Sequence, residues 1–253
     1  MNWVGFYTLI RREVERTFRV ITQTIVTPLI SAFLYIFIFG SIVGGKIDLI
    51  GGVSYISFVL PGILMMNVVA AAFGSTSSAV YFGRWTRNIQ EILVAPLSHL
   101  EMVIGFTLSG VVRGILVGVG VLFIAVLFGV AQMEHFGFFL FYLIGVSAIF
   151  SLLGILAGLQ AGGFEQLSVW NTFIITPLSF LGGVFYSISM LPQNLHVIAL
   201  WNPFFYFADG IRFSMVGISE ANQTFGMLMT LFLIIGLSVL VERLFAKGWR
   251  IRE

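Results

Sequence analysis

The sequence predicts an all-α integral membrane protein with six transmembrane helices, and three observations support this prediction. Of the 253 residues, 58% are hydrophobic and only 9% are charged, whereas soluble domains are about 25% charged. The apolar residues gather in runs of roughly 20 or more, the length that an α-helix needs to cross about 30 Å of hydrocarbon. The 28 glycines suit close helix packing in lipid, whereas a β-barrel would show alternating hydrophobicity.

The first 21 residues are predicted to form an amphipathic helix at the membrane surface. Apolar side chains recur there at three- to four-residue spacing, at Trp3, Phe6, Ile10, Val14, Phe18 and Ile21. The opposite side of the same helix carries Arg12, Glu15, Arg16 and Arg19. This pattern is typical of an interfacial helix over 1-21. Because the apolar run that follows is much longer than a signal-peptide core, we expect no cleaved signal peptide.

Six spanning runs are expected within a single transmembrane domain over 1-253. They cover 22-44, 55-80, 102-128, 136-160, 169-189 and 226-246. The first two spans therefore lie within 22-80, and the third to fifth lie within 102-189. Each run is long enough to cross the hydrocarbon as a helix.

The distribution of positive charge predicts that both ends of the chain face the cytoplasm. With the N-terminus inside, ten of the 13 Lys and Arg residues fall in inner stretches: Arg11, Arg12, Arg16, Arg19, Arg84, Arg87, Arg243, Lys247, Arg250 and Arg252. The outer loops then hold only Lys46 and Arg212, and Arg113 lies inside a helix. This positive-inside bias requires an even number of crossings and a cytoplasmic tail at 247-253.

The inner segment 82-101, between the second and third spans, is polar and amphipathic. Asn88 is expected to cap a short helix, with Glu91 three positions on, and Pro96 to end it. Ser98 and Glu101 then have the spacing of a capping box at the start of the third span. We predict a short cytoplasmic helix in this segment.

The outer segment 190-217 is still rich in Leu, Ile and Phe but is interrupted by Pro192, Asn202 and Pro203. It is too apolar for an ordinary exposed loop. Because backbone in lipid must satisfy its own hydrogen bonds unless it is buried in protein, we predict broken helices that enter the outer leaflet and return. Asp209 and Arg212 stand at i, i+3 there and are expected to form a structural pair.

No motif indicates a catalytic or metal site on this chain. Residues 40-47 have the spacing G-x-x-x-x-G-K, but Ile47 replaces the Ser or Thr that would hold magnesium, and the segment lies on the outer side. The chain has no cysteine, and the predicted topology keeps His99, His135 and His196 too far apart to share a metal. We expect no enzyme activity and no cofactor on this chain.

Arg113 lies about 11 residues into the third span, or some 17 Å deep. An arginine there costs about 2.5–3.5 kcal/mol on insertion scales, so its side chain should face protein or water. Gly110, Gly114 and Gly118 form a small-residue face beside it. Two alternatives stay open: a structural role, with Arg113 paired to carbonyls or a carboxylate at a helix contact, or direct contact with a substrate or a gating role.

Arg84, Arg87, Asn88 and Glu91 present both signs of charge on the short inner helix. The functional interpretation is a docking element for a cytoplasmic partner. The alternative is a solvated loop whose arginines only follow the positive-inside rule.

An ordered set of short motifs resembles one known family over nearly the whole chain. Besides the amphipathic N-terminal helix, the motifs are Phe-Val-Leu-Pro-Gly at 58-62, the run at 87-96, Pro-Leu-Ser-Phe-Leu-Gly-Gly-Val-Phe-Tyr at 177-186, Leu-Pro at 191-192, Trp-Asn-Pro at 201-203 and Asp-Gly-Ile-Arg at 209-212. The set resembles the ABC-2-type permeases, the membrane subunits of type V ABC exporters, and in particular their YadH-like bacterial branch.

The resemblance implies a homodimer in the bacterial inner membrane, with two separately encoded ATPase subunits that bind ATP and Mg²⁺ beneath it. It implies that 88-95 is the coupling helix, with Arg84, Arg87, Asn88, Glu91 and Ile92 at the ATPase, and that 190-217 forms re-entrant helices. Membrane lipids are expected as further partners, and no nucleic acid.

The function expected from this resemblance is ATP-driven export out of the cytoplasm or the inner leaflet. Because few charged residues lie within the spans, we favour an amphipathic, lipid-like or drug-like substrate. A membrane scaffold or sensor that couples to an ATPase without moving cargo is the alternative.

Overall fold

The computed structural model describes residues 2–43 and 49–250. Within these ranges the regular secondary structure is helical, and Ile50 and Val53 form an isolated β-bridge. Among the described residues, five helices are long and apolar enough to cross a membrane: Thr22–Gly40, Tyr55–Trp85, His99–Leu127, Phe136–Gln160 and Gln223–Ala246. These spans agree with the predicted ones to within five residues at each end. The predicted class, an all-α integral membrane protein, is confirmed.

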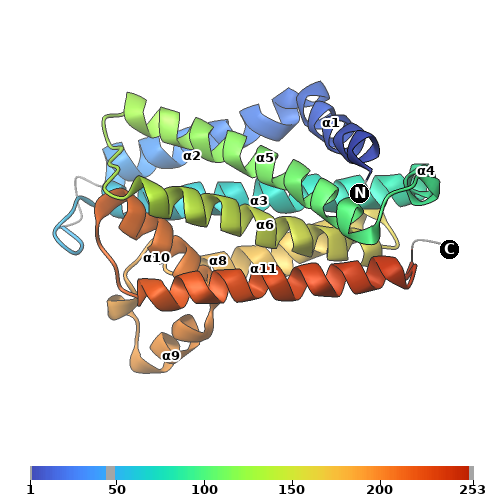
Figure 1. Ribbon diagram of the computed structural model, residues 1–253. Helices are drawn as coiled ribbons and strands as arrows, with labels where there is room; N and C mark the ends of the chain where they lie inside the picture. The colour runs from blue at the N-terminus through green and yellow to red at the C-terminus, as the bar shows by residue number, and fades with distance from the viewer. Residues whose placement is uncertain (1, 44–48, 251–253) are drawn as a thin grey trace.

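Helix α3 (Tyr55–Trp85) lies at the centre of the bundle and packs against α5 (His99–Leu127) and α6 (Phe136–Gln160). It is apolar on nearly all sides, as expected of a helix buried among others. Glycines on α6 allow the close approach: a Cβ at Gly158 would lie 2.7 Å from the carbonyl oxygen of Ser77. Helix α11 (Gln223–Ala246) covers α6 on the outside of the bundle (Figure 1).

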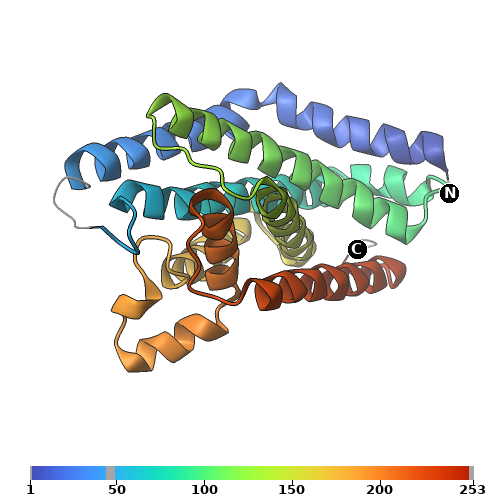
Figure 2. The ribbon, with the colours of Figure 1, turned by 60° about the vertical axis from the view of Figure 1, so that its left-hand side comes forward.

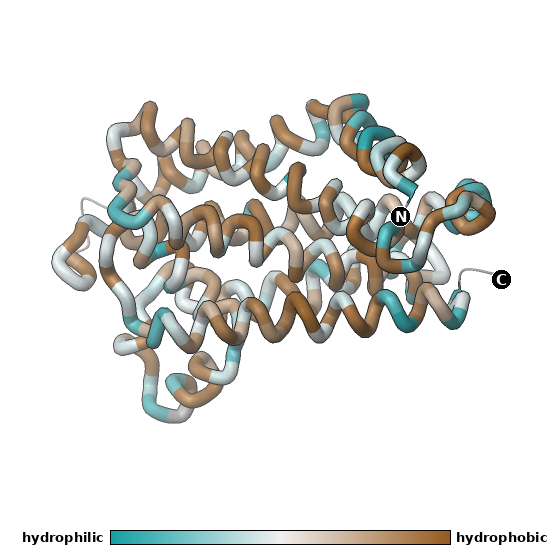
Figure 3. The backbone as a smooth tube through the Cα atoms, in the orientation of Figure 1, coloured by the Kyte–Doolittle hydropathy of each residue, from teal (hydrophilic) through white to brown (hydrophobic). Residues whose placement is uncertain are grey.

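The start of helix α1 (Trp3–Arg19), the short helix α4 (Asn88–Val94) and the end of α11 all lie at one end of the bundle, which we call the α4 end (Figures 1 and 2). Apolar residues cover the middle of the long helices, and hydrophilic residues gather toward the two ends (Figure 3). A chain that begins and finishes at the same end agrees with an even number of passes. Which side of the membrane this end faces stays a prediction.

A helix is present at the N-terminus as predicted, although it ends at Arg19, and its place at the membrane surface stays a prediction. The Asn2 side chain caps it by accepting a hydrogen bond from the Gly5 N–H at 3.1 Å. Its buried residues, Leu9, Glu13 and Thr17, stand four apart and therefore share the face that packs along α5. A π-helical stretch, Thr22–Val26, continues into helix α2 (Thr27–Phe37).

The expected fifth crossing, 169-189, is a composite helix rather than one regular helix. It consists of α7 (Phe164–Trp170), a π-helical stretch (Asn171–Ile175) and α8 (Thr176–Leu181). The helix ends earlier than predicted because the chain turns at Gly182 and Gly183, and Gly183 has a φ of +69° that favours glycine. This element is not among the five candidate spans, so the sixth crossing stays a prediction.

The outer segment folds as broken helices, as predicted. A 3₁₀ turn (Ile188–Met190) leads to α9 (Gln193–Trp201) and α10 (Pro203–Val216). Helix α10 is buried in the bundle, whereas α9 projects from it (Figure 1) and leaves Trp201 85% exposed. Asn202 joins the two helices: its side chain accepts from the Phe204 N–H at 3.1 Å and donates to the Leu178 carbonyl at 2.7 Å. Entry of these helices into the outer leaflet stays a prediction.

Candidate functional site

Helix α4 is a short helix held at the end of the bundle by its apolar side. Ile89 and Ile92 are buried in a cluster that also contains Leu9 of α1 and Val80 of α3. The opposite side, with Glu91, is exposed. The helix is thereby anchored by two side chains and presents a polar face away from the bundle. Of the predicted docking residues, Arg87, Asn88 and Glu91 are exposed, and Ile92 is buried.

The start of α4 differs from the prediction. Arg87, not Asn88, occupies the N-cap position, and it forms no side-chain cap hydrogen bond. Its backbone is left-handed, with φ 60° and ψ 7°, a conformation that few non-glycine residues adopt. Asn88 is therefore the first residue of the helix rather than its cap. The predicted end is confirmed, since α4 stops at Val94 and Pro96 follows.

The Arg84 side chain points back toward the bundle. Its Nη1 donates hydrogen bonds to the carbonyls of Gly158 at 3.0 Å, Leu159 at 2.8 Å and Ala161 at 3.1 Å. The first two carbonyls lie in the last turn of α6 and the third belongs to its C-cap residue. Carbonyls at this end have no partners within a helix, and a cation is favoured there. Arg84 therefore fastens the end of α3, just before α4, to α6.

A groove of about 230 Å³ lies between α1 and α4. Leu9 and Ile92 contribute apolar side chains to its wall, and Arg12 and Glu91 contribute opposite charges. An apolar centre with a charged rim is typical of a protein-docking surface. The groove brings α1 into one surface with α4, the element expected at an ATPase.

One carboxylate connects the start of α1 with the start of α5. Glu101 accepts from the Ser98 N–H at 2.7 Å and the Ser98 hydroxyl at 2.9 Å, and the Glu101 N–H donates to Ser98 Oγ at 3.3 Å. The predicted capping box is therefore confirmed. The sequence did not predict the second contact of this carboxylate, the hydrogen bond from the Asn2 N–H at 3.0 Å. It links α1 to the connection between α4 and α5.

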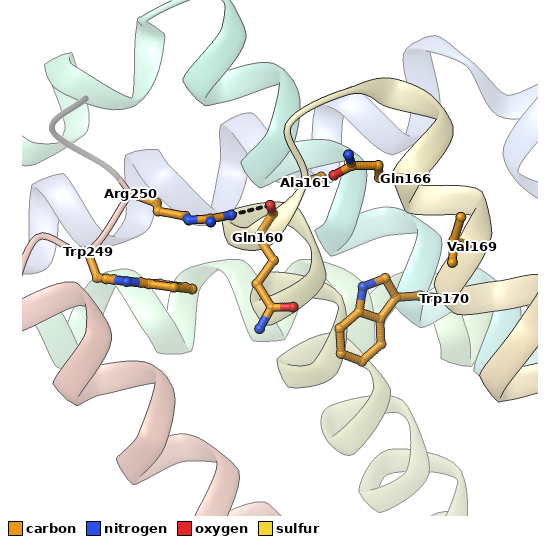
Figure 4. Close-up of a pocket in the computed structure, with 7 residues that line it drawn as sticks. All are labelled: Gln160, Ala161, Gln166, Val169, Trp170, Trp249 and Arg250. Carbon is orange, nitrogen blue, oxygen red and sulfur yellow. Dashed lines mark hydrogen bonds between the residues drawn. The ribbon is translucent and has the colours of Figure 1, made fainter.

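A second pocket at the α4 end, of about 450 Å³, lies where the ends of α6 and α11 meet α7 (Figure 4). Its lining combines Trp170 and Trp249 with the side chains of Gln160 and Gln166. Arg250 donates to the Gln160 carbonyl at 2.6 Å, and its guanidinium lies 5.1 Å from the Trp249 ring centroid. Such a mixture of indole and polar groups suits the membrane interface. No local motif indicates this pocket, because its three elements meet only in the fold.

Arg113 lies in the middle of α5 without a partner in the described part of the chain. It forms no hydrogen bond or ion pair there, and its buried Nε has no acceptor. The predicted small-residue face beside it is confirmed, because a Cβ at Gly110 or Gly114 would overlap Ser151 or Ser147 of α6. The pairing with carbonyls or a carboxylate that a structural role would require is not observed within 2–43 and 49–250.

Glu13 and Arg16 of α1 form a polar contact that the sequence pattern did not indicate. Arg16 Nη2 lies 3.1 Å from Glu13 Oε2 and donates to the Ser75 carbonyl of α3 at 2.9 Å. Glu13 is only 4% exposed. In the sequence Arg16 belongs to the charged side of an interfacial helix, and only the packing of α1 against the bundle shows that it points inward.

Arg212 is fully buried and interacts mainly with backbone carbonyls. It donates from Nε to the Phe58 carbonyl at 3.2 Å and from Nη2 to the Gly183 carbonyl at 2.6 Å. Its guanidinium lies 3.9 Å from the Phe58 ring centroid. The predicted pair with Asp209 is present at 3.8 Å between Nη1 and Oδ1. Arg212 thus joins α10 to α3 and to the turn after α8.

Asp209 is also fully buried and accepts four hydrogen bonds from the connection between α10 and α11 and from the first residue of α11. The donors are the Glu220 N–H at 2.9 Å, the Ala221 N–H at 3.0 Å, the Ser219 hydroxyl at 3.0 Å and Gln223 Nε2 at 2.8 Å. The carboxylate therefore fixes the approach to α11, and the pair with Arg212 connects this loop to α3.

The remaining predicted positions lie apart from these groups. His99 begins α5, His135 precedes α6, and His196 lies on α9. Within the described residues, no three side chains from His, Cys, Asp and Glu form a group that could hold a metal. Much of the segment 40-47, including Lys46 and Ile47, lies outside the described residues, as does Arg252.

Comparison with known proteins gives consistent matches over most of the chain. A family model described as ABC-2 type transporter matches residues 4–216. The inner membrane transport permease YadH of Escherichia coli K12 is 36% identical over 231 residues, which cover 90% of each chain. Nodulation protein J of Rhizobium leguminosarum biovar viciae is 27% identical over 228 residues, which cover 88% of this chain and 85% of that protein.

The matched region contains α1, α4 and α10, the elements whose motifs carried the resemblance in the sequence. The similarity to a YadH permease confirms the branch that the motifs predicted. This chain belongs to the ABC-2 type transporter family, the membrane permeases that normally pair with an ABC ATPase.

Proposed function

We propose that the chain is the membrane subunit of an ATP-driven exporter and that separate ATPase subunits dock at the α4 end. The observation that carries this proposal is the joint surface of α1 and α4. Helix α4 is anchored by Ile89 and Ile92 and turns Glu91 outward beside a groove that also contains Arg12. A short anchored helix of this kind can be pushed as a unit, because its apolar side is part of the bundle core.

The topology that we propose has six crossings, with the composite helix α7–α8 as the fifth and the α4 end in the cytoplasm of a bacterium. The cations near this end, among them Arg87, Arg243 and Lys247, support that orientation. Helices α9 and α10 would then lie in the outer half of the membrane, where the apolar exposed surface of α9 would contact lipid.

Movement of α4 has two routes into the membrane domain. Ile89 and Ile92 pack against α1, α3 and α5 through their common cluster. The Glu101 carboxylate joins the first residues of α1 and α5. A displacement of α4 would therefore move three helices together, since packed helices shift as rigid bodies.

The cargo that we propose is amphipathic, and the transport pathway runs between two copies of the chain, walled by α2, α3 and the composite helix. Helix α3 is mostly buried, but a narrow stripe of partly exposed residues runs along it and includes Asn67, Gly74 and Ser78. A cavity of about 150 Å³ beside it combines Tyr35, Met66, Asn67 and Phe185. Aromatic and apolar side chains with one amide suit a lipid-like or drug-like molecule better than a strongly ionic one.

The test is reconstitution of the full chain with its ATPase in proteoliposomes. We expect the two proteins to copurify and Glu91→Arg to abolish stimulated ATP hydrolysis. Glu165→Arg is the matched control, because it reverses an exposed charge at the start of α7, outside the groove. Full activity of the Glu91→Arg complex would overturn the docking role. ATP hydrolysis without cargo on the far side would favour the scaffold or sensor alternative.

A further inference from the structure

Helices α1 and α5 run side by side from the α4 end, so positions along them can be compared. Their first turns are joined by the hydrogen bond from the α1 cap to the Glu101 carboxylate. Gly105 of α5 packs against Leu9 of α1: a Cβ at Gly105 would lie 2.7 Å from the Leu9 side chain. Arg16 comes seven residues after Leu9, and Arg113 comes eight residues after Gly105. At 1.5 Å per residue, both arginines lie about 10–12 Å further into the membrane.

Contacts through α3 place the two arginines at the same depth independently. Arg16 donates to the carbonyl of Ser75. The next residue of α3, Thr76, packs against Gly110 of α5. A Cβ at Gly110 would lie 2.8 Å from the methyl carbon of Thr76. Gly110 is one helical turn before Arg113. The charge of Arg16 accordingly repels that of Arg113.

The Arg113 side chain points away from the exposed side of α5. Leu108 and Val119 are 38% and 51% exposed. Arg113 comes five residues after Leu108 and six residues before Val119. With 3.6 residues per turn, it therefore lies on roughly the opposite side of the helix from both. It therefore projects inward, toward the space between α1 and α3, rather than toward lipid.

The charges in this space do not balance. Arg16 and Arg113 supply two cations, whereas the carboxylate of Glu13 pairs, among the described residues, with Arg16 alone. The Nε atoms of both arginines are buried without an acceptor in the described part of the chain. Unpaired N–H groups are costly in a low-dielectric interior, and repulsion between the two guanidinium groups adds to that cost. One further negative charge would neutralise the group and accept both N–H donors.

We propose that Arg16 and Arg113 bind the anionic head, a phosphate or a carboxylate, of an amphipathic molecule in the half of the membrane nearest α4. This inference rests on the proposed transport function and assigns its cargo a negative charge. Guanidinium groups suit this ligand because their donors match the oxygens of phosphate and carboxylate. Because Arg113 lies within one of the long apolar helices, the ligand also needs an apolar part.

The experiment measures lipid retained by the purified full chain. The chain is extracted in the presence of one of two lipid probes, phosphatidylglycerol or phosphatidylcholine. Native mass spectrometry then counts the lipid molecules bound to the chain. We expect retained phosphatidylglycerol to fall about tenfold in the double variant Arg16→Gln, Arg113→Gln, which corresponds to about 1.4 kcal/mol. Phosphatidylcholine retention should stay unchanged.

Arg19→Gln is the matched control, because Arg19 is on the same helix but its side chain is 79% exposed. It should retain phosphatidylglycerol like the unaltered chain. Equal retention by the double variant and the unaltered chain would overturn the proposal. Displacement of the lipid by millimolar inorganic phosphate would overturn the amphipathic assignment, because the site would then recognise free phosphate.

Two further measurements keep the result independent of folding and of the ATPase. Thermal unfolding of the unaltered chain should shift upward with phosphatidylglycerol and not with phosphatidylcholine, and the absence of a shift would contradict the site even if the double variant does not fold. Because both assays use the permease alone, failure to bind an ATPase would refute the proposed docking and leave these outcomes unchanged.

Discussion

Replacement of Arg212 by methionine should destabilise the protein strongly. The fully buried guanidinium donates to the carbonyls of Phe58 and Gly183 and lies over the Phe58 ring. Methionine removes both hydrogen bonds and leaves the carbonyls, together with Asp209, without their cation. Hydrogen bonds of a charged group contribute about 1.5–3 kcal/mol each, and breaking a buried ion pair from one side costs about 3–5 kcal/mol. We expect a loss of about 3–5 kcal/mol in the free energy of unfolding.

The same change at Arg113 is the matched comparison. Arg113 has no acceptor in the described part of the chain, so Arg113→Met should cost less than about 1 kcal/mol or be neutral. Denaturant unfolding of both variants in the same detergent, followed by tryptophan fluorescence, measures the difference. Equal losses for the two variants would show that the number of acceptors does not decide how an intramembrane arginine contributes to stability.

A double-mutant cycle with Asp209→Asn separates the ion pair from the carbonyl contacts. Because the closest N–O distance of the pair is 3.8 Å and Arg212 Nη1 has no hydrogen bond to the described residues, we expect a coupling energy of about 0.5–3 kcal/mol. This is smaller than the loss from Arg212→Met alone, since Phe58 and Gly183 account for the rest. A coupling energy as large as the whole single-variant loss would refute this division.

Three further predictions concern the packing and the α4 end. Ser98→Ala should cost about 1 kcal/mol of unfolding free energy through loss of the capping box, and an unchanged denaturation midpoint would contradict this. Gly158→Ala should lower the free energy of unfolding by about 1–3 kcal/mol, because the new Cβ would meet the Ser77 carbonyl. Gly137→Ala on the same helix should be tolerated, since its Cβ would meet no atom within 4 Å. Equal shifts in melting temperature for the two variants would argue against close packing at Gly158. Arg84→Gln should speed amide exchange in α4 about tenfold, or about 1.4 kcal/mol of local stability, and unchanged exchange would show that α4 does not depend on this anchor.

Features encoded in a few consecutive residues were predictable from the sequence. The capping box was correct because Ser98 and Glu101 are three residues apart and interact within one turn. The long spans were correct because a continuous apolar run has one stable conformation in lipid. The cap of α4 was wrong because it depends on the left-handed backbone of Arg87, which no side-chain pattern indicates.

Features that join distant segments were not predictable. Asp209 was the expected partner of Arg212 because it stands three residues away, yet the hydrogen bonds of Arg212 go to Gly183 and to Phe58, 154 residues earlier. Similarly, Arg16 matches the charged side of a surface helix until the carbonyl of Ser75, 59 residues away, is found beside it. In both cases the helix pattern specifies the face, and the packing decides the partner.

Helix α1 connects the two sites proposed for this permease. Leu9 and Arg12 line the groove beside α4, and Arg16, two turns after Leu9, belongs with Arg113 to the proposed anion site. Because α1 is one continuous helix from Trp3 to Arg19, an ATPase that shifts its first turns also shifts Arg16. The separation of the two guanidinium groups, and with it the affinity for an anion, would then follow the state of the ATPase. Energy from ATP would then reach the cargo through the position of one arginine relative to another.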